Sequence, residues 1–352
     1  MIPALVSAMR LIGTRQRGAP TKRSTCLRKM HGDGFVQTTK ARPQLRVPLI
    51  CMLAVASAQV CFAQVQLPAV NLGDTNFEHG LGAPGWIVEE FPAGYTASEI
   101  KDAYGNTVPG SNRVTTYSTT THIALISRRR FLGAWLVGEA LQPFADINLE
   151  LASGTDSRVL GFGDLTVGPG LQWAPRKVGT GIFAQRAMID VGVPTGKYSD
   201  NRPVNIGNHF VSLTPTYVFT YEPNKEVEFS AQLFFLWNST NNDPFTGFGI
   251  KSTQSGQAVH ANYATSYKIF KSVRVGFNGY WLQQLTDHAI NGIRIPDSKE
   301  RTVGLGPGVQ FGGTGLWLRV NSYMETDVRD RPSGIKVTFR ASKTLGAARP
   351  EP

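Results

Sequence analysis

The sequence contains no cysteine beyond residue 61, because Cys26, Cys51 and Cys61 all lie close to its N-terminus. This distribution excludes a disulfide framework and a thiolate metal site from the rest of the chain. It suits a protein that crosses an oxidising periplasm, where free thiols would pair with one another.

Charged residues are scarce as well, since they make up 17% of the chain, and the mean hydropathy is only -0.15. That hydropathy excludes a membrane protein built from many helices, each of which needs about 20 apolar residues in a row. It is compatible with a membrane β-barrel, whose strands are apolar on one face only.

The net charge of +11 is concentrated near the N-terminus. Residues 1–63 contain 10 of the 36 Lys and Arg residues but a single acidic one, Asp33, whereas 26 basic and 24 acidic residues follow from Gln64 onward. The main part of the chain therefore has no strong positive field, and we expect no nucleic-acid partner.

The N-terminal region has the layout of an export signal. Three basic residues within 40–46 precede an apolar stretch at 47–58, and small residues follow up to Ala63. A basic region, a short apolar core and small residues before a cleavage site are typical of a secretory signal peptide. We predict cleavage after Ala63, with Ala58 as the second choice. A membrane anchor is the alternative, but the apolar stretch is shorter than a spanning helix requires.

Beyond about residue 110, apolar and polar side chains alternate in segments that are separated by turns. In residues 227–237 the odd positions are apolar, and Glu228, Ser230 and Gln232 lie between them. Such alternation gives a strand with one apolar and one polar face. The pattern predicts about 12 strands. Their expected ranges are 75–87, 113–127, 133–151, 162–174, 181–194, 209–221, 226–239, 258–269, 272–287, 300–311, 314–328 and 333–344.

The connections between these strands alternate in length. Those at 88–112, 195–208, 240–257 and 288–299 are long and polar, whereas those at 128–132, 222–225, 270–271 and 312–313 are short. Outer-membrane barrels have short periplasmic turns and long external loops. A soluble β-sandwich is the alternative, but its strands are usually shorter.

We therefore predict an all-β fold, namely a transmembrane antiparallel up-and-down β-barrel of about 12 strands. The barrel is expected to span residues 64–345, after a leader at 1–63 and before a C-terminal tail at 346–352. Its location would be the bacterial outer membrane of a Gram-negative cell.

Short motifs follow one another over most of residues 76–311. They include Phe77-Glu78-His79-Gly80, Phe91-Pro92-Ala93-Gly94-Tyr95, Gly161-Phe162-Gly163-Asp164, Val193-Pro194-Thr195-Gly196-Lys197-Tyr198, Asn205-Ile206-Gly207-Asn208, Gly279-Tyr280-Trp281 and Gly304-Leu305-Gly306-Pro307. In these motifs the chain resembles the outer-membrane family encoded beside genes for meta-pathway phenol degradation. The resemblance implies a barrel with a role in the transport of aromatic or hydrophobic compounds, and it brings no catalytic residues. Residues 340–352 depart from it, because they run past the aromatic end usual for a last barrel strand.

No arrangement of residues indicates catalysis. His209 and Ser212 are close in sequence, but their odd separation on one strand would point them to opposite faces. The chain also lacks a G-x-S-x-G nucleophile elbow and an H-E-x-x-H metal motif. We predict that the protein is not an enzyme and needs no cofactor or metal. The run Arg128-Arg129-Arg130 resembles a twin-arginine export signal, but its place at an expected turn indicates a basic periplasmic turn instead.

Charged residues on the polar strand faces are the functional candidates. By parity they are expected to face the lumen, and they are Arg186, Asp190, Glu228, His260, Lys268, Arg274, Arg319, Glu325, Lys336 and Arg340. The C-terminal members form a largely basic wall, and such a wall would favour anionic solutes. Alternatively, the charges pair with one another and close the lumen.

From these patterns we expect an outer-membrane channel or transporter for small, aromatic or hydrophobic solutes. The alternative is a structural or surface-interaction barrel without transport activity, whose long loops bind a partner. The expected partners are the lipid bilayer, lipopolysaccharide, a small-molecule solute and the outer-membrane assembly machinery.

Overall fold

The wall of the molecule is a single closed β-sheet. The computed structural model describes residues 65, 67–68, 70–75, 77–154, 156–313 and 315–346, so the expected leader and most of the expected tail lie outside the described residues. The wall consists of β1 (Gly85–Glu90), β2 (Ala93–Lys101), β3 (Arg113–Phe131), β4 (Ala134–Glu150), β5 (Asp156–Phe162), β6 (Leu165–Val178), β7 (Gly181–Val193), β8 (Ser212–Glu222), β9 (Val227–Asn238), β12 (Ala258–Phe270), β13 (Val273–Gln284), β16 (Arg301–Gly313), β17 (Leu316–Arg329) and β18 (Arg331–Leu345).

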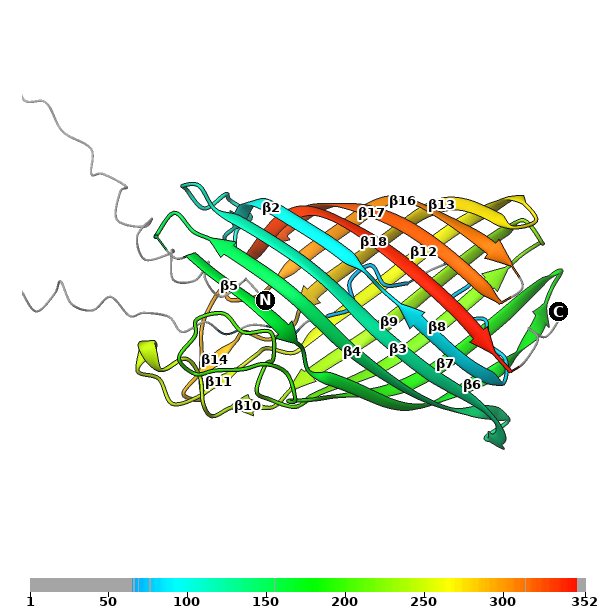
Figure 1. Ribbon diagram of the computed structural model, residues 1–352, viewed down its shortest axis with the longest axis horizontal. Coiled ribbons are helices and arrows are strands. Elements are labelled where there is room, and N and C mark those ends of the chain that lie inside the picture. Colours follow the sequence, from blue (N-terminus) through cyan, green and yellow to red (C-terminus); the bar gives the residue numbers. More distant parts are fainter. Residues whose placement is uncertain are drawn as a thin grey trace, which may run out of the picture.

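These segments form a barrel of 12 strands, because two of the strands are each interrupted once (Figure 1). β1 and β2 both pair with β3 on one side and with β18 on the other, and β5 and β6 both pair with β4. Every pairing is antiparallel, and the contact of β18 with β1 and β2 closes the ring. The predicted fold class is confirmed.

The interruption between β1 and β2 does not open the wall. Pro92 has no N–H to donate, but its carbonyl accepts a hydrogen bond from the Phe339 N–H at 2.8 Å. On the other side, the Phe91 N–H donates to the Thr120 carbonyl at 3.0 Å. The hydrogen bonding therefore continues across the break, as a lipid-exposed barrel wall requires.

The prediction of a first strand at 75–87 is wrong. The first strand begins at Gly85, and the residues expected to form a long loop at 88–112 include half of β1 and all of β2. Trp86 and Val88 alternate with half-buried residues as a lipid-facing strand does. Residues 71–84 lack such an alternation and are rich in glycine, which favours an irregular path over a strand.

The outer face of the barrel is apolar and the inner face is largely polar. Phe277 and Met324 point outward with exposed fractions of 69% and 67%, whereas their neighbours Asn278 and Glu325 are buried. Because side chains alternate along a strand, this pattern follows directly from the period-two sequence. A large exposed apolar belt on a closed barrel is the arrangement of a membrane-spanning β-barrel.

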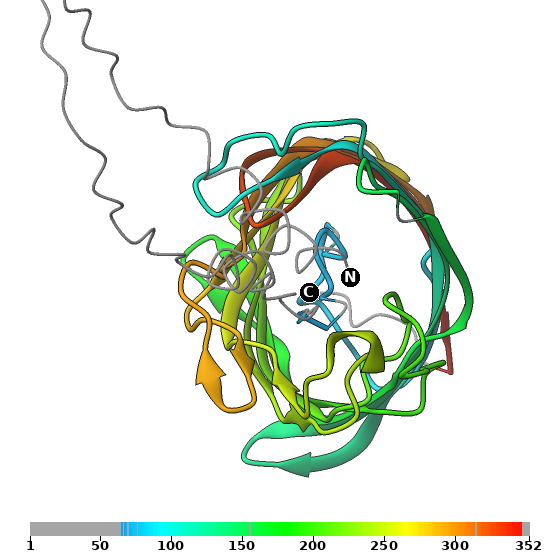
Figure 2. The ribbon, with the colours of Figure 1, turned by 90° about the vertical axis from the view of Figure 1, so that its left-hand side faces the viewer.

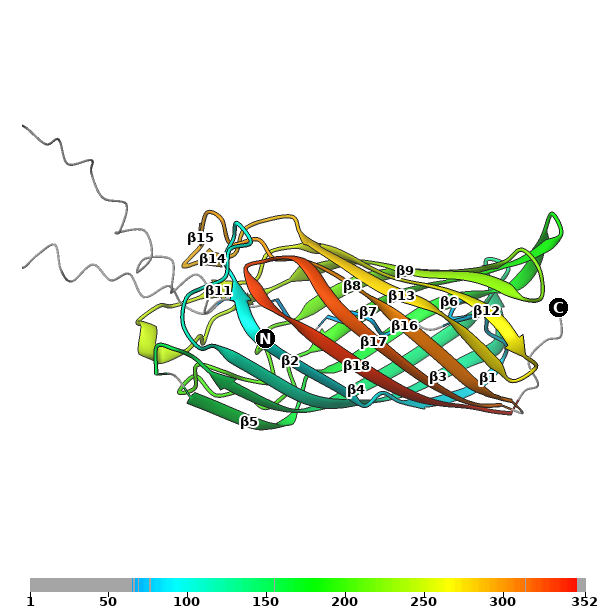
Figure 3. The ribbon, with the colours of Figure 1, turned by 90° about the horizontal axis from the view of Figure 1, so that it is seen from above.

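The two ends of the barrel differ. At one end, here named the loop end, long connections carry the small sheet of β10 (Thr240–Asn241), β11 (Thr253–Gln254), β14 (Ala289–Ile290) and β15 (Ile293–Arg294), together with the 3-10 helix η1 (Thr246–Phe248) (Figure 3). At the other end, here named the turn end, the connections are short. Among the described residues, no helix has the length and apolar character needed to cross a membrane.

Three of the motifs that carried the family resemblance meet at one point near the loop end. The Asp164 carboxylate accepts hydrogen bonds at 2.8 Å from the N–H groups of Gly196 and Asn208. A Cβ at Gly196 would lie 2.7 Å from the Gly163 carbonyl carbon and from the Gly207 Cα, so the backbones touch only because these residues are glycines. These motifs therefore specify a loop junction.

An arginine on the outer face should be far more damaging than one on the inner face. We expect Ile123→Arg on β3 to impair membrane insertion by about 2–4 kcal/mol, because it places a cation among lipid chains. Thr120→Arg on the same strand faces a cavity inside the barrel and should be tolerated. Refolding into lipid vesicles, followed by heat-modifiable gel mobility, measures both variants. Equal losses would contradict the assignment of the faces.

Candidate functional site

The interior of the barrel contains part of the protein itself. The described residues between 65 and 84, here named the N-terminal segment, run inside the ring of strands (Figure 2). Near the loop end, the Leu67 N–H lies 3.4 Å from Glu300 Oε1. Towards the turn end, the Gly80 N–H donates to Thr220 Oγ1 at 2.8 Å. The segment thus passes through the lumen from one end towards the other.

In the middle of the lumen, side chains of the wall bind the backbone of this segment. Asn262 accepts a hydrogen bond from the Gly73 N–H at 2.9 Å and donates to the Asn71 carbonyl at 2.6 Å. The Tyr323 hydroxyl donates to the Gly73 carbonyl at 2.8 Å. Gly73 has a φ of +80°, and a Cβ there would lie 2.9 Å from the Tyr323 ring. Buried backbone groups outside a sheet need such partners, and the polar inner face supplies them.

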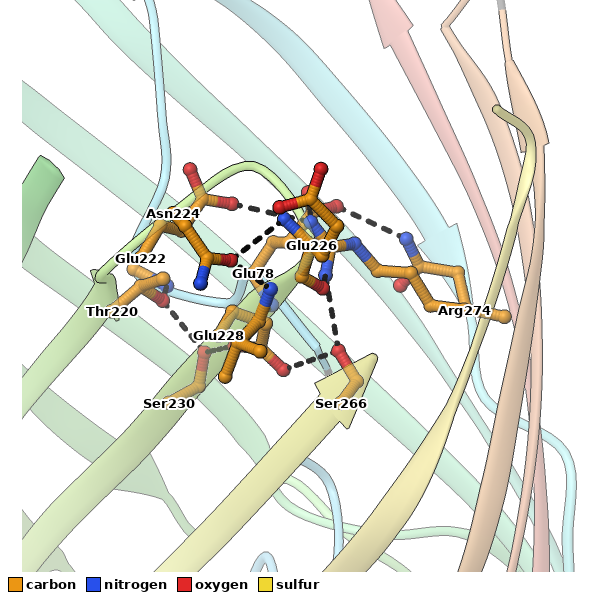
Figure 4. Close-up of polar contacts among 12 residues, drawn as sticks. Glu78, Thr220, Glu222, Asn224, Glu226, Glu228, Ser230, Ser266 and Arg274 are labelled. Carbon is orange, nitrogen blue, oxygen red and sulfur yellow. Dashed lines mark hydrogen bonds and ion pairs between the residues drawn. The ribbon is translucent and has the colours of Figure 1, made fainter. Parts of the chain in front are cut away.

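Near the turn end the segment is held by an ion-pair cluster (Figure 4). Arg274 lies 3.2 Å from the carboxylate of Glu78 and 3.5 Å from that of Glu222, and it donates to the Glu226 carbonyl at 3.1 Å. Gln310 donates a further hydrogen bond to Glu78 at 3.1 Å. Arg274, Glu78 and Gln310 are all buried, so this contact is shielded from solvent.

Glu228 extends the same cluster along β9 and is fully buried. Its carboxylate accepts hydrogen bonds from Ser230 at 2.6 Å, from Ser266 at 2.8 Å and from the Glu78 N–H at 3.1 Å. A buried carboxylate is tolerated only when donors surround it, and here one of the donors is the backbone of the N-terminal segment. Glu228 and Arg274 therefore act together as an anchor for residues 78–80.

The expected basic wall is present, but acidic residues neutralise much of it. Arg340 binds the Glu89 carboxylate through two nitrogens, with Nε at 2.9 Å, and donates to the Asp74 carbonyl at 2.7 Å. Lys336 lies 3.7 Å from the Asp74 carboxylate and also donates to the Leu72 carbonyl. Together with Arg274, these contacts link three of the five expected cations to acidic partners.

The remaining candidate residues are distributed over the lumen. Arg186 donates long hydrogen bonds, at 3.4 Å to Gln172 and 3.5 Å to the His79 carbonyl. Arg319 donates to Gln310 at 2.7 Å. Lys268 lies near the turn end, where its backbone N–H donates to the Glu226 carbonyl at 2.8 Å.

His260 and Glu325 lie closer to the loop end. The His260 ring stacks on Phe234 with the ring centroids 4.0 Å apart. Glu325 accepts hydrogen bonds from the hydroxyl groups of Tyr95 at 2.7 Å and Tyr280 at 3.0 Å, and from the Gly334 N–H at 3.0 Å.

Two cavities remain beside the N-terminal segment. The inner cavity, of about 530 Å³, extends towards the turn end, and the outer cavity, of about 340 Å³, extends towards the loop end. Both are lined by Asn71, Asp74, Phe91, Leu141 and Asp190, so the two spaces meet at this level. The lumen is therefore narrowed by the segment, but space remains along most of its length.

The two cavities differ in chemistry. The outer cavity has many apolar side chains, among them Tyr95, Ile206 and Leu236. The inner cavity is lined by five carboxylates and three guanidinium groups. Its acidic members are Asp74, Glu78, Glu89, Glu139 and Asp190, and its basic members are Arg186, Arg319 and Arg340. The carboxylates of this lining outnumber its guanidinium groups, so the inner cavity is not the basic wall that would favour anions.

Sequence parity did not reveal the acidic half of this lumen. Glu78 was assigned to the expected strand at 75–87, Asp74 lay just before that strand, and Glu89 was assigned to an external loop, so none of them was a candidate. His122 joins two further acids, since its ring nitrogens lie 2.7 Å from Glu89 and 3.0 Å from Glu139. His122 occupies an inward-facing even position on its expected strand and Glu139 an inward-facing odd position on the next, so parity itself was the signal that would have found them.

No cluster of three or more histidine, cysteine, aspartate or glutamate residues arranged to hold a metal ion occurs in the described part of the chain. The cysteines of this sequence all precede residue 65, outside that part.

The family model described as "Putative MetA-pathway of phenol degradation" matches residues 97–341. The chain belongs to this family. The match excludes residues 77–80 and 91–95, although motifs there contributed to the resemblance seen in the sequence. No curated protein sequence matches the chain.

Among solved structures, the chain is similar to the COG4313 outer membrane channel from Pseudomonas putida F1. The TM-score is 0.67 at 14% identity, and the match covers 75% of this chain and 97% of that one. A FadL homologue from Pseudomonas aeruginosa matches with a TM-score of 0.37 at 10% identity, over 75% of this chain and 91% of that one. The first likeness supports the barrel fold, and the second is too weak to add to it.

A side chain at Gly80 should displace the N-terminal segment from its anchor. A Cβ there would lie 2.5 Å from the Thr220 backbone nitrogen, so Gly80→Val cannot dock without moving the segment. We expect added protease to cleave the variant within residues 65–84 much faster than the wild-type protein, with the barrel intact. Gly138→Ala, where a Cβ would meet nothing within 4 Å, is the control. Equal cleavage of all three proteins would contradict the anchoring role.

Removal of Arg274 should destabilise the folded barrel. Arg274→Met removes the guanidinium that pairs with the buried carboxylate of Glu78 and the half-buried one of Glu222, and breaking such a buried pair costs about 3–5 kcal/mol. We expect urea unfolding in detergent or lipid to shift to lower urea concentration. Arg158→Met, which removes an exposed and solvent-screened ion pair with Asp146, should leave the unfolding midpoint almost unchanged. Similar shifts for the two variants would show that the cluster carries little energy.

Proposed function

We propose that the protein is an outer-membrane channel through which small aromatic or hydrophobic solutes pass by diffusion. The observation that carries the proposal is the pair of cavities that meet beside the N-terminal segment, inside a barrel with an apolar outer face. The similar protein from Pseudomonas putida is itself named an outer membrane channel. The family's link to phenol degradation supports an aromatic solute.

The lining of the outer cavity supports this class of solute. Phe91, Tyr95, Leu141, Ile206 and Phe234 offer aromatic and aliphatic surface to a ring-shaped molecule. A binding space that is mostly apolar, with a few polar groups for orientation, is typical of small-molecule sites. The acidic residues of both cavities favour uncharged solutes over carboxylates, contrary to the anion preference expected from the basic wall.

The route that we propose follows β3, β4 and β7. Arg186 and Asp190 on β7 line it, and Asp190 contributes to both cavities. Glu228 and Arg274 belong instead to the anchor of the N-terminal segment, on the opposite side of that segment. In this proposal the ten residues selected by parity divide between a solute route and an internal scaffold, and none has a catalytic role.

We also propose that the loop end faces the outside of the cell and the turn end faces the periplasm. Long external loops and short periplasmic turns are the rule for such barrels. The proposal includes export by a signal peptide cleaved near Ala63, insertion by the outer-membrane assembly machinery, and contact of the loop end with lipopolysaccharide.

Electrical recording in planar bilayers tests the channel. We expect small, stable conductance with a preference for cations, because carboxylates outnumber cations along both cavities. Asp74→Asn removes a carboxylate that lines both cavities and should lower the cation-to-anion permeability ratio by about twofold, whereas Asp243→Asn on an exposed loop should not. Added phenol should reduce the ion current at lower concentrations than benzoate does.

Gly80→Val provides a second arm of this test, because release of the segment should raise the conductance. If neither the wild-type protein nor the Gly80→Val variant conducts ions, the proposed channel function is wrong. A structural or surface-interaction barrel, with the loop-end sheet as its contact surface, would then be the better account.

A further inference from the structure

Two neighbouring hairpins extend from the turn end of the barrel. Residues 127–135 connect β3 to β4 and residues 174–183 connect β6 to β7, and we name them together the hairpin pair. They are neighbours in the wall because β4 pairs with β6, with Trp135 opposite Gln172. The β3–β4 hairpin bends outside the outline of the barrel when the molecule is viewed end-on (Figure 2). A register irregularity interrupts the pairing in each hairpin, and bulges of this kind bend a strand.

The hairpin pair is strongly basic. Arg128, Arg129, Arg130, Arg176 and Lys177 are all exposed, and neither hairpin contains an acidic residue. Within the part of the chain that the structure describes, no ion pair forms at any of these five cations. Cations at the loop end differ, because several of them lie beside acids, as Arg158 does beside Asp146 and Lys101 beside Glu99.

The tips of these hairpins are apolar although they are exposed. Leu132 is 71% exposed, Phe131 is 58% exposed and Val178 is 42% exposed. Leu132 also has a φ of +49°, in the left-handed region where hairpin turns normally place asparagine or glycine. Leu132 is therefore unfavourable in water for two reasons: its backbone adopts a left-handed conformation, and its apolar side chain is exposed. Contact with an apolar medium would remove the second cost.

Two of the five cations of the hairpin pair lie against aromatic rings. The Arg130 guanidinium is 5.4 Å from the centroid of Trp135, and the Arg176 guanidinium is 5.4 Å from that of Phe183. These contacts hold each positive group beside apolar surface. Cations that flank exposed aromatic and aliphatic residues match the boundary between lipid phosphates and acyl chains, where amphipathic side chains gather.

We propose that the hairpin pair binds the phosphate groups of anionic phospholipids in the inner leaflet of the membrane. The five cations contact the headgroups, and Phe131, Leu132 and Val178 enter the adjacent apolar layer. This inference rests on the proposed function only in taking the barrel to span the outer membrane with its turn end towards the periplasm. It does not depend on whether the lumen conducts.

Lipid retention by the purified full-length mature protein tests the proposal. The protein is reconstituted with phosphatidylethanolamine and phosphatidylglycerol, extracted in mild detergent, and the bound lipids are counted by native mass spectrometry. We expect phosphatidylglycerol to be enriched on the wild-type protein. The variant R128Q/R129Q/R130Q should bind it about fivefold more weakly or worse, because a basic residue near an anionic membrane contributes on the order of a factor of five.

The matched control R202Q/K251Q/K299Q removes three exposed cations from the loop end and should retain the wild-type enrichment. Equal retention of both lipids by the wild-type protein would overturn the proposal, and so would equal losses in the two variants. Loss of a bound protein partner in place of lipid would assign the surface to that partner and would also overturn it.

A fluorescent label measures where the tips lie. The mature chain expected after cleavage has no cysteine, so Leu132→Cys gives a single site for a polarity-sensitive fluorophore. In lipid vesicles we expect blue-shifted emission at 132 and water-like emission from the control Lys251→Cys. Water-like emission at 132 would overturn the proposal. Ion conductance is measured on the same samples, so that the lipid proposal and the channel proposal are tested separately. If the protein does not conduct but still enriches phosphatidylglycerol, only the proposed channel function is contradicted.

Discussion

The structure depends on one constraint, which is that a backbone surrounded by lipid must satisfy all its hydrogen bonds within the protein. A closed antiparallel sheet meets this requirement. The wall remains hydrogen-bonded even at Pro92, which has no N–H to donate. At Pro92 the neighbouring strands still bond to the chain on both sides of the break. Because β1 and β2 lie on the line that closes the ring, an unpaired edge there would expose polar backbone to the membrane.

The same constraint produces a polar interior, and the polar interior determines what the N-terminal segment can do. A segment without regular secondary structure carries backbone groups that a dry core would not satisfy. Asn262, Tyr323 and Thr220 satisfy them from the inner face of the wall. Arg274 adds charge, since its pairing with Glu78 and with the half-buried Glu222 offsets the cost of burying Arg274 and Glu78. The anchored segment in turn narrows the lumen.

The lumen is asymmetric as a result. Most anchoring groups lie on β8, β9, β12, β13, β16, β17 and β18, whereas much of the lining of the inner cavity comes from β3, β4 and β7. A mutation of a charged residue therefore has different consequences on the two sides of the lumen. On the first side a buried charge has a fixed protein partner, and on the second Arg186 and Asp190 remain next to space. Outside the lumen the two ends also differ, because several cations at the loop end lie beside acids, whereas in the described structure none of those in the hairpin pair forms an ion pair.

The sequence by itself determined the barrel, because alternation of apolar and polar residues is a local property that a strand converts directly into two faces. The pattern predicted the number of strands, the limits of most of them, and the contrast between long and short connections. It did not determine the contents of the lumen, since residues 71–84 carry no periodicity and their position is set by distant partners such as Asn262 and Arg274. Parity likewise indicated that Arg340 and Lys336 point inward, but not that Glu89 and Asp74 would neutralise them. Only the tertiary structure decided those pairings, because charges on separate segments meet only after the ring has closed around the chain.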